Sequence, residues 1–467
     1  MTNISALQSA LSGLLAQRQR LDVIGHNVAN ANTDGYSRQR ADLVSGGRGP
    51  VPALYSTGLI TGDGVDVAGV SRSRDDFLEA RVIGERSANA NLAKSSTYLD
   101  RIELVHAEPS DDGLAASLDA LWAAFDEVAN YPDEIPQRQA ALEQANTLVE
   151  QFRFMDGEVR ALHATAVLEA GALVSQVNDL AAQVADLNDA IRPLYLGGAN
   201  ANDLLDQRDL AVARLAELVG GVVHNRDDGT VNVTVAGSTI VSGSRSVELQ
   251  TDTVVDPALA DVGLRRLRFM WASGQEVVPD GGEAAALVTS ANIDIPDAIR
   301  SLDGVAASLV SKVNTLHSTG QDLNGTTGLN FFDPAGVTAT TIAVSSDVVG
   351  QPDRIAAADT GAGLWDATIA QSIADLREAD DGPDADYAQL VGSLGVRVGS
   401  ARARSNAQQG VLDRVDQARL SARAVNIDEE MIDLVAAQRA YEASARVINA
   451  VDEMLDQLVN RLGLVGR

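Results

Sequence analysis

The sequence contains no cysteine, few aromatic residues and no long apolar run. Without cysteine the chain forms no disulfide, no thiolate metal site and no cysteine nucleophile. No stretch approaches the ~20 consecutive apolar residues of a membrane-spanning helix, so we expect no membrane insertion. Aromatic residues make up 4% of the chain against 45% hydrophobic residues, which favours helices packed through Ala, Leu and Val. Because domains usually hold ~100–200 residues, the chain is expected to form about two to four of them.

Positive charge is also scarce in this chain. The formal net charge is -29, which would repel phosphate, and we therefore expect no nucleic-acid partner. The imbalance is uneven, because residues 1–48 carry more Arg than acids whereas residues 425–467 carry more acids than Arg. A slightly basic first helix and an acidic last helix would attract each other weakly, although two independently solvated faces explain the same pattern.

Catalytic and metal-binding patterns are absent from the sequence. The five histidines lack the i,i+4 partner of a zinc helix, and the carboxylate clusters at 111–112 and 380–386 lack the ladder of a calcium loop. The glycine-rich stretches have neither a P-loop lysine nor a Gly-x-Gly-x-x-Gly frame, and there is no Gly-x-Ser-x-Gly elbow. We therefore predict that the chain is not an enzyme and holds no cofactor and no metal ion.

Both ends of the chain have the pattern of heptad helices. Apolar residues recur every three or four positions, which places an apolar seam on one side of each helix. The seam residues are Ile4, Leu7, Leu11, Leu14, Leu21 and Val28 in the first helix, and Ile427, Met431, Leu434, Tyr441, Ile448, Leu455, Val459 and Leu462 in the last. Such a seam needs a partner, either the other terminal helix or a neighbouring subunit. The pattern is typical of a component of an assembly.

Between the ends the period changes from helical to alternating and back. The first helix should end near Asn30, and further helices are predicted over 74–106, from 114 onward, over 136–193, over 296–318, over 364–378 and from about 385 to 462. Glycines at 392, 395 and 399 are possible breaks in the last of these. Val231, Val233 and Val235 alternate with polar residues, so roughly 221–280 is predicted to be a small β-rich unit.

These patterns predict a mainly α protein with an inserted β-rich domain. The terminal helices would pair as a coiled coil, long helices would form a bundle, and the small β domain would lie at the distal end. Residues 1–60 with 425–467 would form an inner coiled-coil assembly domain. Residues 61–220 with 296–424 would form the helical bundle, with a segment of loop and short strand at about 320–362. Residues 221–295 would form the outer β-rich domain.

The turn after the first helix resembles a known signature. Asn27-Val28-Ala29-Asn30-Ala31-Asn32-Thr33-Asp34-Gly35-Tyr36-Ser37-Arg38-Gln39 is similar to a segment shared by bacterial flagellar axial proteins of rod, hook and junction, and its Tyr-Ser-Arg-Gln ending resembles the family of the first hook-associated protein. Residues 108–114, 202–209 and 425–431 resemble further stretches of that family in the expected order, so the resemblance covers nearly the whole chain. The family commonly has Pro where this chain has Asp34. The chain is also short after Phe331-Phe332, which leaves an additional outer domain without support.

The resemblance implies a structural protein that joins hook to filament and polymerises through its terminal helices after export. The implied partners are other copies in a ring-like layer, the hook protein, a second junction protein next to the filament, the flagellar export apparatus and an export chaperone. The implied location is extracellular, in the flagellum, reached without a cleaved signal peptide. Another axial protein, of hook or distal rod, is the alternative, and it would show a phenylalanine/lysine form of the motif in place of Tyr36-Ser37-Arg38.

Assembly contacts are expected in the two apolar seams and in the signature, at Asn30, Asn32, Gly35, Tyr36, Arg38 and Gln39. Arg38 would be a hydrogen-bonding clamp at a subunit or interdomain contact, although local stabilisation of the turn accounts for the same residues. We further expect residues 1–40 and 425–467 to be poorly ordered in the free monomer. A short helix pair buries too little apolar surface to offset an ordering entropy of ~1–2 kcal/mol per residue.

Overall fold

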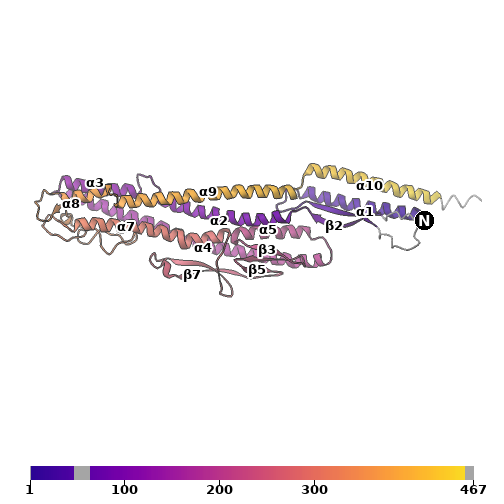
Figure 1. Ribbon diagram of the computed structural model, residues 1–467, viewed down its shortest axis with the longest axis horizontal. Helices are drawn as coiled ribbons and strands as arrows, with labels where there is room; N and C mark the ends of the chain where they lie inside the picture. The colour runs from indigo at the N-terminus through magenta and orange to yellow at the C-terminus, as the bar shows by residue number, and fades with distance from the viewer. Residues whose placement is uncertain (1, 47–63, 458–467) are drawn as a thin grey trace, which may run out of the picture.

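The computed structural model describes residues 2–46 and 64–457, and Figure 1 shows an elongated molecule with both terminal helices at one end. Of the predicted seam, Val459 and Leu462 and the side chain of Ile4 lie outside the described part. The described chain is mainly α-helical with a few small antiparallel sheets, as the sequence predicts. Among the described helices, none combines the length and the hydrophobicity that a membrane span requires.

The two terminal helices, α1 (Thr2–Ala29) and α10 (Ile427–Asp456), lie side by side and antiparallel (Figure 1). Helix α10 begins after Asn426, whose side chain accepts hydrogen bonds from the backbone N–H groups of Asp428 and Glu429. Strands β1 (Gln39–Gly46) and β2 (Gly64–Arg72) pair antiparallel and pack on α1. The pairing of the termini with each other is thus present in a single chain, whereas its coiled-coil geometry stays a prediction.

A long helical bundle extends from this end (Figure 1). Helices α2 (Asp76–His106) and α9 (Pro383–Arg423) run side by side along it. Helix α4 (Ile135–Leu196) has 62 residues, which at 1.5 Å per residue reach about 90 Å. The other helices are α3 (Leu114–Asn130), α5 (Asn202–Val219), α6 (Gly282–Thr289), α7 (Ile295–His317) and α8 (Thr368–Ala374), with short helical turns at Pro257–Leu259, Ser290–Asp294, Pro352–Arg354 and Asp375–Glu378.

Two small sheets form the β-rich unit. One has the strand order β3 (Val222–Asn225), β4 (Val231–Val235), β5 (Ser238–Ser242), β6 (Arg245–Ser246), and the other has the order β7 (Leu249–Val255), β8 (Arg265–Trp271), β9 (Glu276–Val277). The predicted alternation in β4 is confirmed, because Val231, Val233 and Val235 are buried and the residues between them are half-buried. A further pair, β10 (Gly320–Gln321) and β11 (Ala358–Asp359), lies in the segment predicted as loop and short strand.

The β-rich unit lies on the flank of the bundle, so the predicted position at the distal end is wrong (Figure 1). The end opposite the termini is formed by α3, α8 and the loops beside them. The reason is the length and direction of α4, which returns toward the termini before the strands begin. The sheets then pack along its second half, where Asn188 donates to the carbonyl of Val231 and Asn178 to that of Leu249, both at 2.9 Å.

Two apolar clusters form the core of the bundle. One joins α4 to the sheets and contains Val184 and Phe269, and the other lies around Trp122 and Phe331 near the end opposite the termini. Neither cluster contains a described residue of α1, α10, β1 or β2. The terminal helices are therefore attached to the bundle by something other than the hydrophobic core.

Candidate functional site at the joint

The turn after α1 is held by the side chain of Asn27. The Asn27 Nδ2 group donates to the backbone carbonyl of Gln39 and the backbone N–H of Gln39 donates to Asn27 Oδ1, both at 2.9 Å. The Tyr36 hydroxyl donates to the same Oδ1 at 2.8 Å and lies 2.9 Å from Nδ1 of His26. Gly35 has a φ of +82°, a conformation that favours glycine in such a turn.

Burial raises the pKa of the Tyr36 hydroxyl above its usual value, and the nearby carboxylates of Asp203, Asp206 and Glu430 raise it further. The hydroxyl therefore stays protonated and keeps its role as a donor. These carboxylates come from helices remote in the sequence, so Tyr36 lies at a meeting point of several elements.

Arg38 joins the signature to the start of α10. Its Nε donates to Oε1 of Glu430 at 2.7 Å, and its Nη1 donates to Oε2 of Glu429 at 3.0 Å. The side chain of Glu430 is only 2% exposed, and its other oxygen accepts a hydrogen bond from Nδ2 of Asn27 at 3.0 Å. Arg20 of α1 adds an ion pair with Asp433 at 2.7 Å. The side chain of Arg38 thus makes contacts between elements, whereas the local turn is held by Asn27, Tyr36 and Gln39.

Helix α5 holds the signature from the other side. Asp206 accepts a hydrogen bond from the backbone N–H of Ser37 at 2.9 Å, and Asp203 accepts one from the side chain of Gln39 at 2.8 Å. Arg72, at the end of β2, bonds both Asp206 at 2.7 Å and Asp209 at 2.9 Å. Burial lowers the pKa of Arg72, but these carboxylates outweigh it and the pKa is raised overall. These three aspartates were not among the predicted site residues, and their spacing of three residues places them on one face of α5.

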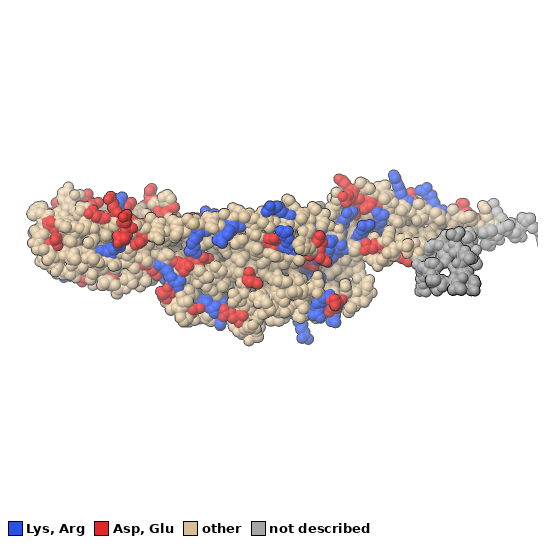
Figure 2. Space-filling model, in the orientation of Figure 1, with Lys and Arg blue, Asp and Glu red and all other residues tan. Residues whose placement is uncertain are grey.

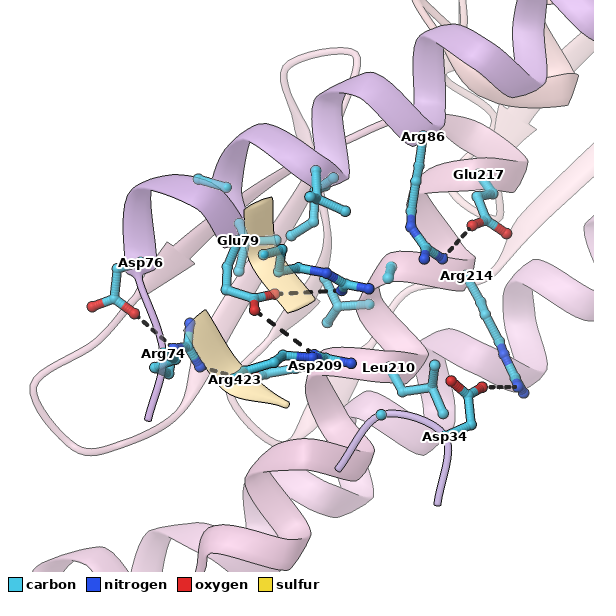
Figure 3. A pocket seen from close by; sticks show the side chains of 18 of the residues that line it. Asp34, Arg74, Asp76, Glu79, Arg86, Asp209, Leu210, Arg214, Glu217 and Arg423 are labelled. Carbon is cyan, nitrogen blue, oxygen red and sulfur yellow. Dashed lines mark hydrogen bonds and ion pairs between the residues drawn. The ribbon is translucent and has the colours of Figure 1, made fainter. Parts of the chain in front are cut away.

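We call this network the joint, and its members are Asn27, Tyr36, Arg38, Arg72, Asp203, Asp206 and Glu430. A cavity of about 230 Å³ lies beside it, between α2, α5 and the end of α9 (Figure 3). Its walls are lined by ion pairs: Arg86 with Glu217 at 2.7 Å, Arg74 with Asp209 at 2.6 Å, and Glu79 with Arg423 at 3.7 Å. In Figure 3 Arg86 of α2 points toward Glu217 of α5, and Glu79 of α2 points toward Arg423 of α9. These ion pairs connect α2 to α5 and to the end of α9.

The apolar seam residues fall into two groups. Leu7, Leu14, Leu21 and Val28 on α1 and Leu434, Tyr441, Ile448 and Leu455 on α10 are half-buried, whereas Leu11, Ile427 and Met431 are exposed. Of the two signature asparagines, Asn30 is half-buried and donates to the carbonyl of His26 at 3.0 Å, and Asn32 is exposed.

The most enclosed line on α10 consists of residues that the sequence analysis did not select. Glu430, Ala437 and Val451 are buried and Ser444 is half-buried, and these four are spaced by seven residues. A Cβ on Gly13 of α1 would lie 3.2 Å from Oγ of Ser444, so the helices approach closely there. Small residues permit this approach, and a search for large apolar side chains does not detect them.

Two of the histidines, His106 and His317, are buried in the fold. Burial lowers the pKa of His106 and of His317 to about 4, and His317 accepts a hydrogen bond from the backbone N–H of Ala356 at 2.9 Å. In the described part of the chain no group of three or more His, Asp or Glu side chains is placed to hold a metal ion.

Comparison with known proteins connects this architecture to the flagellum. Residues 99–332 match the family model of the flagellar hook-associated protein FlgK helical domain. Residues 7–36 match the model of flagella basal body rod proteins, and residues 416–462 match that of the flagellar basal body rod FlgEFG protein C-terminal region. The two terminal models cover most of α1 and α10, and Asp203 and Asp206 on α5 lie within the range of the central one.

Relatives cover most of the chain. Flagellar hook-associated protein 1 of Bacillus subtilis is 27% identical over 99% of both chains, and that of Escherichia coli is 25% identical over 98% of this chain and 99% of its own. The protein of that name from Salmonella typhimurium is 31% identical over 70% of this chain and 59% of its own. The solved structure of the flagellar hook junction protein FlgK from Burkholderia pseudomallei matches with a TM-score of 0.59 at 16% identity, covering 73% of this chain and 100% of that one, which shows a common fold.

Proposed function

Because the chain belongs to the flagellar hook-associated protein 1 family, we propose that this structural component of the bacterial flagellum joins hook to filament. It polymerises through its terminal helices after export. Its partners are other copies of itself in a ring-like layer, the hook protein below and a second junction protein above. The export apparatus and a chaperone act before assembly.

The central part of the chain favours a junction protein over the alternative, a hook or distal-rod protein. The matches at residues 7–36 and 416–462 are to rod-protein models, and they fit any axial protein equally well. The match at 99–332 is to a hook-associated helical domain, and it covers the longest helix of the bundle, α4, together with α3, α5 and α7. Tyr36-Ser37-Arg38 supports the same choice, because the alternative predicts phenylalanine and lysine there.

The observation that carries the polymerisation proposal is the apolar surface left on the terminal pair. Leu11 and Leu15 of α1, and Met431, Ile432 and Val435 of α10, are exposed although the two helices are already packed on each other. An exposed apolar stripe on a helix pair is the kind of surface that neighbouring subunits cover. In this proposal residues 1–60 with 425–467 form the inner assembly domain, 61–220 with 296–424 the surrounding bundle, and 221–295 an outer β-rich domain.

Electron microscopy of a strain lacking the gene, with flagellin assayed in the medium, tests the proposal. We expect complete hooks without filaments, and flagellin lost to the medium. Missing hooks would assign the chain to the hook or rod instead, and normal filaments would refute the junction role.

A further inference from the structure

The end of the molecule opposite the termini carries exposed apolar side chains. Trp365 is 78% exposed and Leu364 56% exposed, in the loop that precedes α8, whereas the two other tryptophans are buried. Tyr131 and Ile135, at the turn between α3 and α4, are also exposed. Tryptophan and tyrosine are enriched among the residues that dominate binding energy at protein interfaces.

The chain that leads to the tryptophan loop is tied to the α3–α4 turn at Ile355. The guanidinium of Arg138 donates to the carbonyls of both Pro132 and Ile355, so the α3–α4 turn and the chain leading to the tryptophan loop lie within reach of one side chain. The loop is itself held, because Asp366 accepts a hydrogen bond from the backbone N–H of Asp359 at 2.6 Å. The tryptophan is therefore presented on a fixed support.

This end is also strongly acidic. Residues 107–135 contain eight acids and no Lys or Arg, and residues 318–390 contain twelve acids against two arginines. Figure 2 shows red side chains over this end with little blue beside them, whereas blue and red are interspersed over the rest of the same face. One of the two arginines, Arg377, is already paired with Asp119 at 3.0 Å. The field at this end attracts a basic partner.

We propose that this acidic end, which we call the tryptophan tip and define as Tyr131, Ile135, Leu364, Trp365 and the acids of 107–135 and 318–390, docks on a basic surface of a different flagellar axial protein. The inference rests on the proposed function, since it takes the chain to be assembled in the flagellar axis. A second copy does not supply the charge, because the chain carries -29 overall and most of its arginines in the described part are ion-paired with its own acids.

The test uses a single introduced thiol beside the tryptophan. The chain has no cysteine, and a Cβ on Gly363 meets nothing within 4 Å, so Gly363→Cys adds a unique reactive group next to Leu364 without a clash. Gly171→Cys, on the exposed side of α4 and equally free of contacts, is the matched control. Maleimide labelling is compared between the free monomer and hook–filament complexes purified from motile cells.

We expect both thiols to label in the monomer and the thiol at 363 to lose its labelling in the complexes. Labelling at 363 that is as fast in the complexes as in the monomer overturns the proposal. Filaments on the Gly363→Cys cells show that the labelled protein still assembles. The junction role is tested separately, because it fails only if the deletion strain keeps normal filaments or lacks hooks.

Two further variants test the chemistry of the contact. Trp365→Ala, and Asp133→Asn combined with Glu134→Gln, change exposed side chains and should leave the thermal unfolding of the monomer unchanged. Each variant should restore labelling at 363 in the complexes. High salt should also restore labelling in the parent, because it screens the attraction between the acidic end and its partner, and the charge variant should need less salt than the parent. Protection that persists at high salt and in both variants would rule out a basic partner recognised through the tryptophan.

Discussion

Replacement of Arg38 by alanine tests whether the joint holds the start of α10. The guanidinium bonds a carboxylate, Glu430, whose side chain is 2% exposed, while Arg38 itself is 28% exposed. Removing one partner of a buried ion pair typically destabilises by about 3–5 kcal/mol. Because Arg38 is partly solvated and Asn27 still donates to Glu430, we expect about 2–3 kcal/mol here.

The loss should appear at the terminal helices and leave the bundle intact. Neither apolar cluster includes α10, so the affected equilibrium is the opening of the terminal pair, a local event that hydrogen exchange detects. A change of 2–3 kcal/mol corresponds to a ~30- to 150-fold loss of protection for amides in the first turns of α10. Mass spectrometry of the monomer would measure it peptide by peptide, with the amides of α4 as an internal reference.

Two variants make this prediction refutable. Arg446→Ala removes a residue that is 77% exposed and 3.5 Å from Glu442, and it should change protection by less than about 0.5 kcal/mol. In a Glu430→Gln background the buried carboxylate that bonds Arg38 is absent, so Arg38→Ala leaves no unpaired charge at position 430 and should do much less harm there than in the parent. Equal effects of Arg38→Ala in both backgrounds, or an effect no larger than that of Arg446→Ala, would refute the clamp.

Three further predictions concern pH, backbone conformation and assembly. Burial raises the pKa of the Asp384 carboxyl to about 6 from 3.8. The folded state therefore binds this proton more tightly than the unfolded state, and the protein gains stability as pH falls from about 6 toward 4. Asp384→Asn removes the buried charge, so it should raise Tm at neutral pH and lose that advantage near pH ~4. Gly282 has a φ of +66° and its Cβ would lie 2.6 Å from backbone atoms, so Gly282→Ala should lower the free energy of unfolding by about 2 kcal/mol or more. Gly304→Ala, at a free position in α7, should raise it by about 0.5–1 kcal/mol, and denaturant titration distinguishes the two. Met431→Gln, which polarises the exposed side of α10, should leave monomer unfolding within about 0.5 kcal/mol yet release flagellin into the medium. Leu104→Gln on α2, where the leucine is even more exposed, should not release flagellin.

The helices were predictable because their signal is local. The predicted spans 74–106 and 296–318 match α2 and α7 within a few residues. The prediction of one long helix over 136–193 is confirmed by α4, although Gly157 and Gly171 weaken it. Helix α9 also runs without interruption through the glycines at 392, 395 and 399, where breaks were considered. Each glycine costs about 1 kcal/mol, and packing of α9 along the whole of α2 offsets that cost.

Contacts between remote segments were not predictable in the same way. Arg38 was selected from its motif, but its partner Glu430 lies 392 residues away and has the appearance of an ordinary acid in the first turn of a helix. Asp206, which holds Ser37, is likewise one acid among the 65 Asp and Glu residues of the chain. The lateral position of the sheets depends on the direction in which α4 leaves the bundle, and hydrophobic periodicity contains no information about direction.

A polar joint and an apolar bundle core have different thermodynamic consequences. Apolar burial is non-directional and scales with area, so it stabilises the bundle without fixing the angle at which a helix pair leaves it. The hydrogen bonds of Asn27, Arg38 and Glu430 are directional and few, so they define that angle while leaving the pair able to open. In the proposed assembly, a neighbouring subunit that covers Leu15 and Ile432 would bind the closed pair in preference to the open one, and a ligand selective for one state stabilises that state by mass action. Closure of the joint and assembly would then be coupled, and a variant that loosens the joint should raise the subunit concentration needed for assembly by the same factor by which it increases opening.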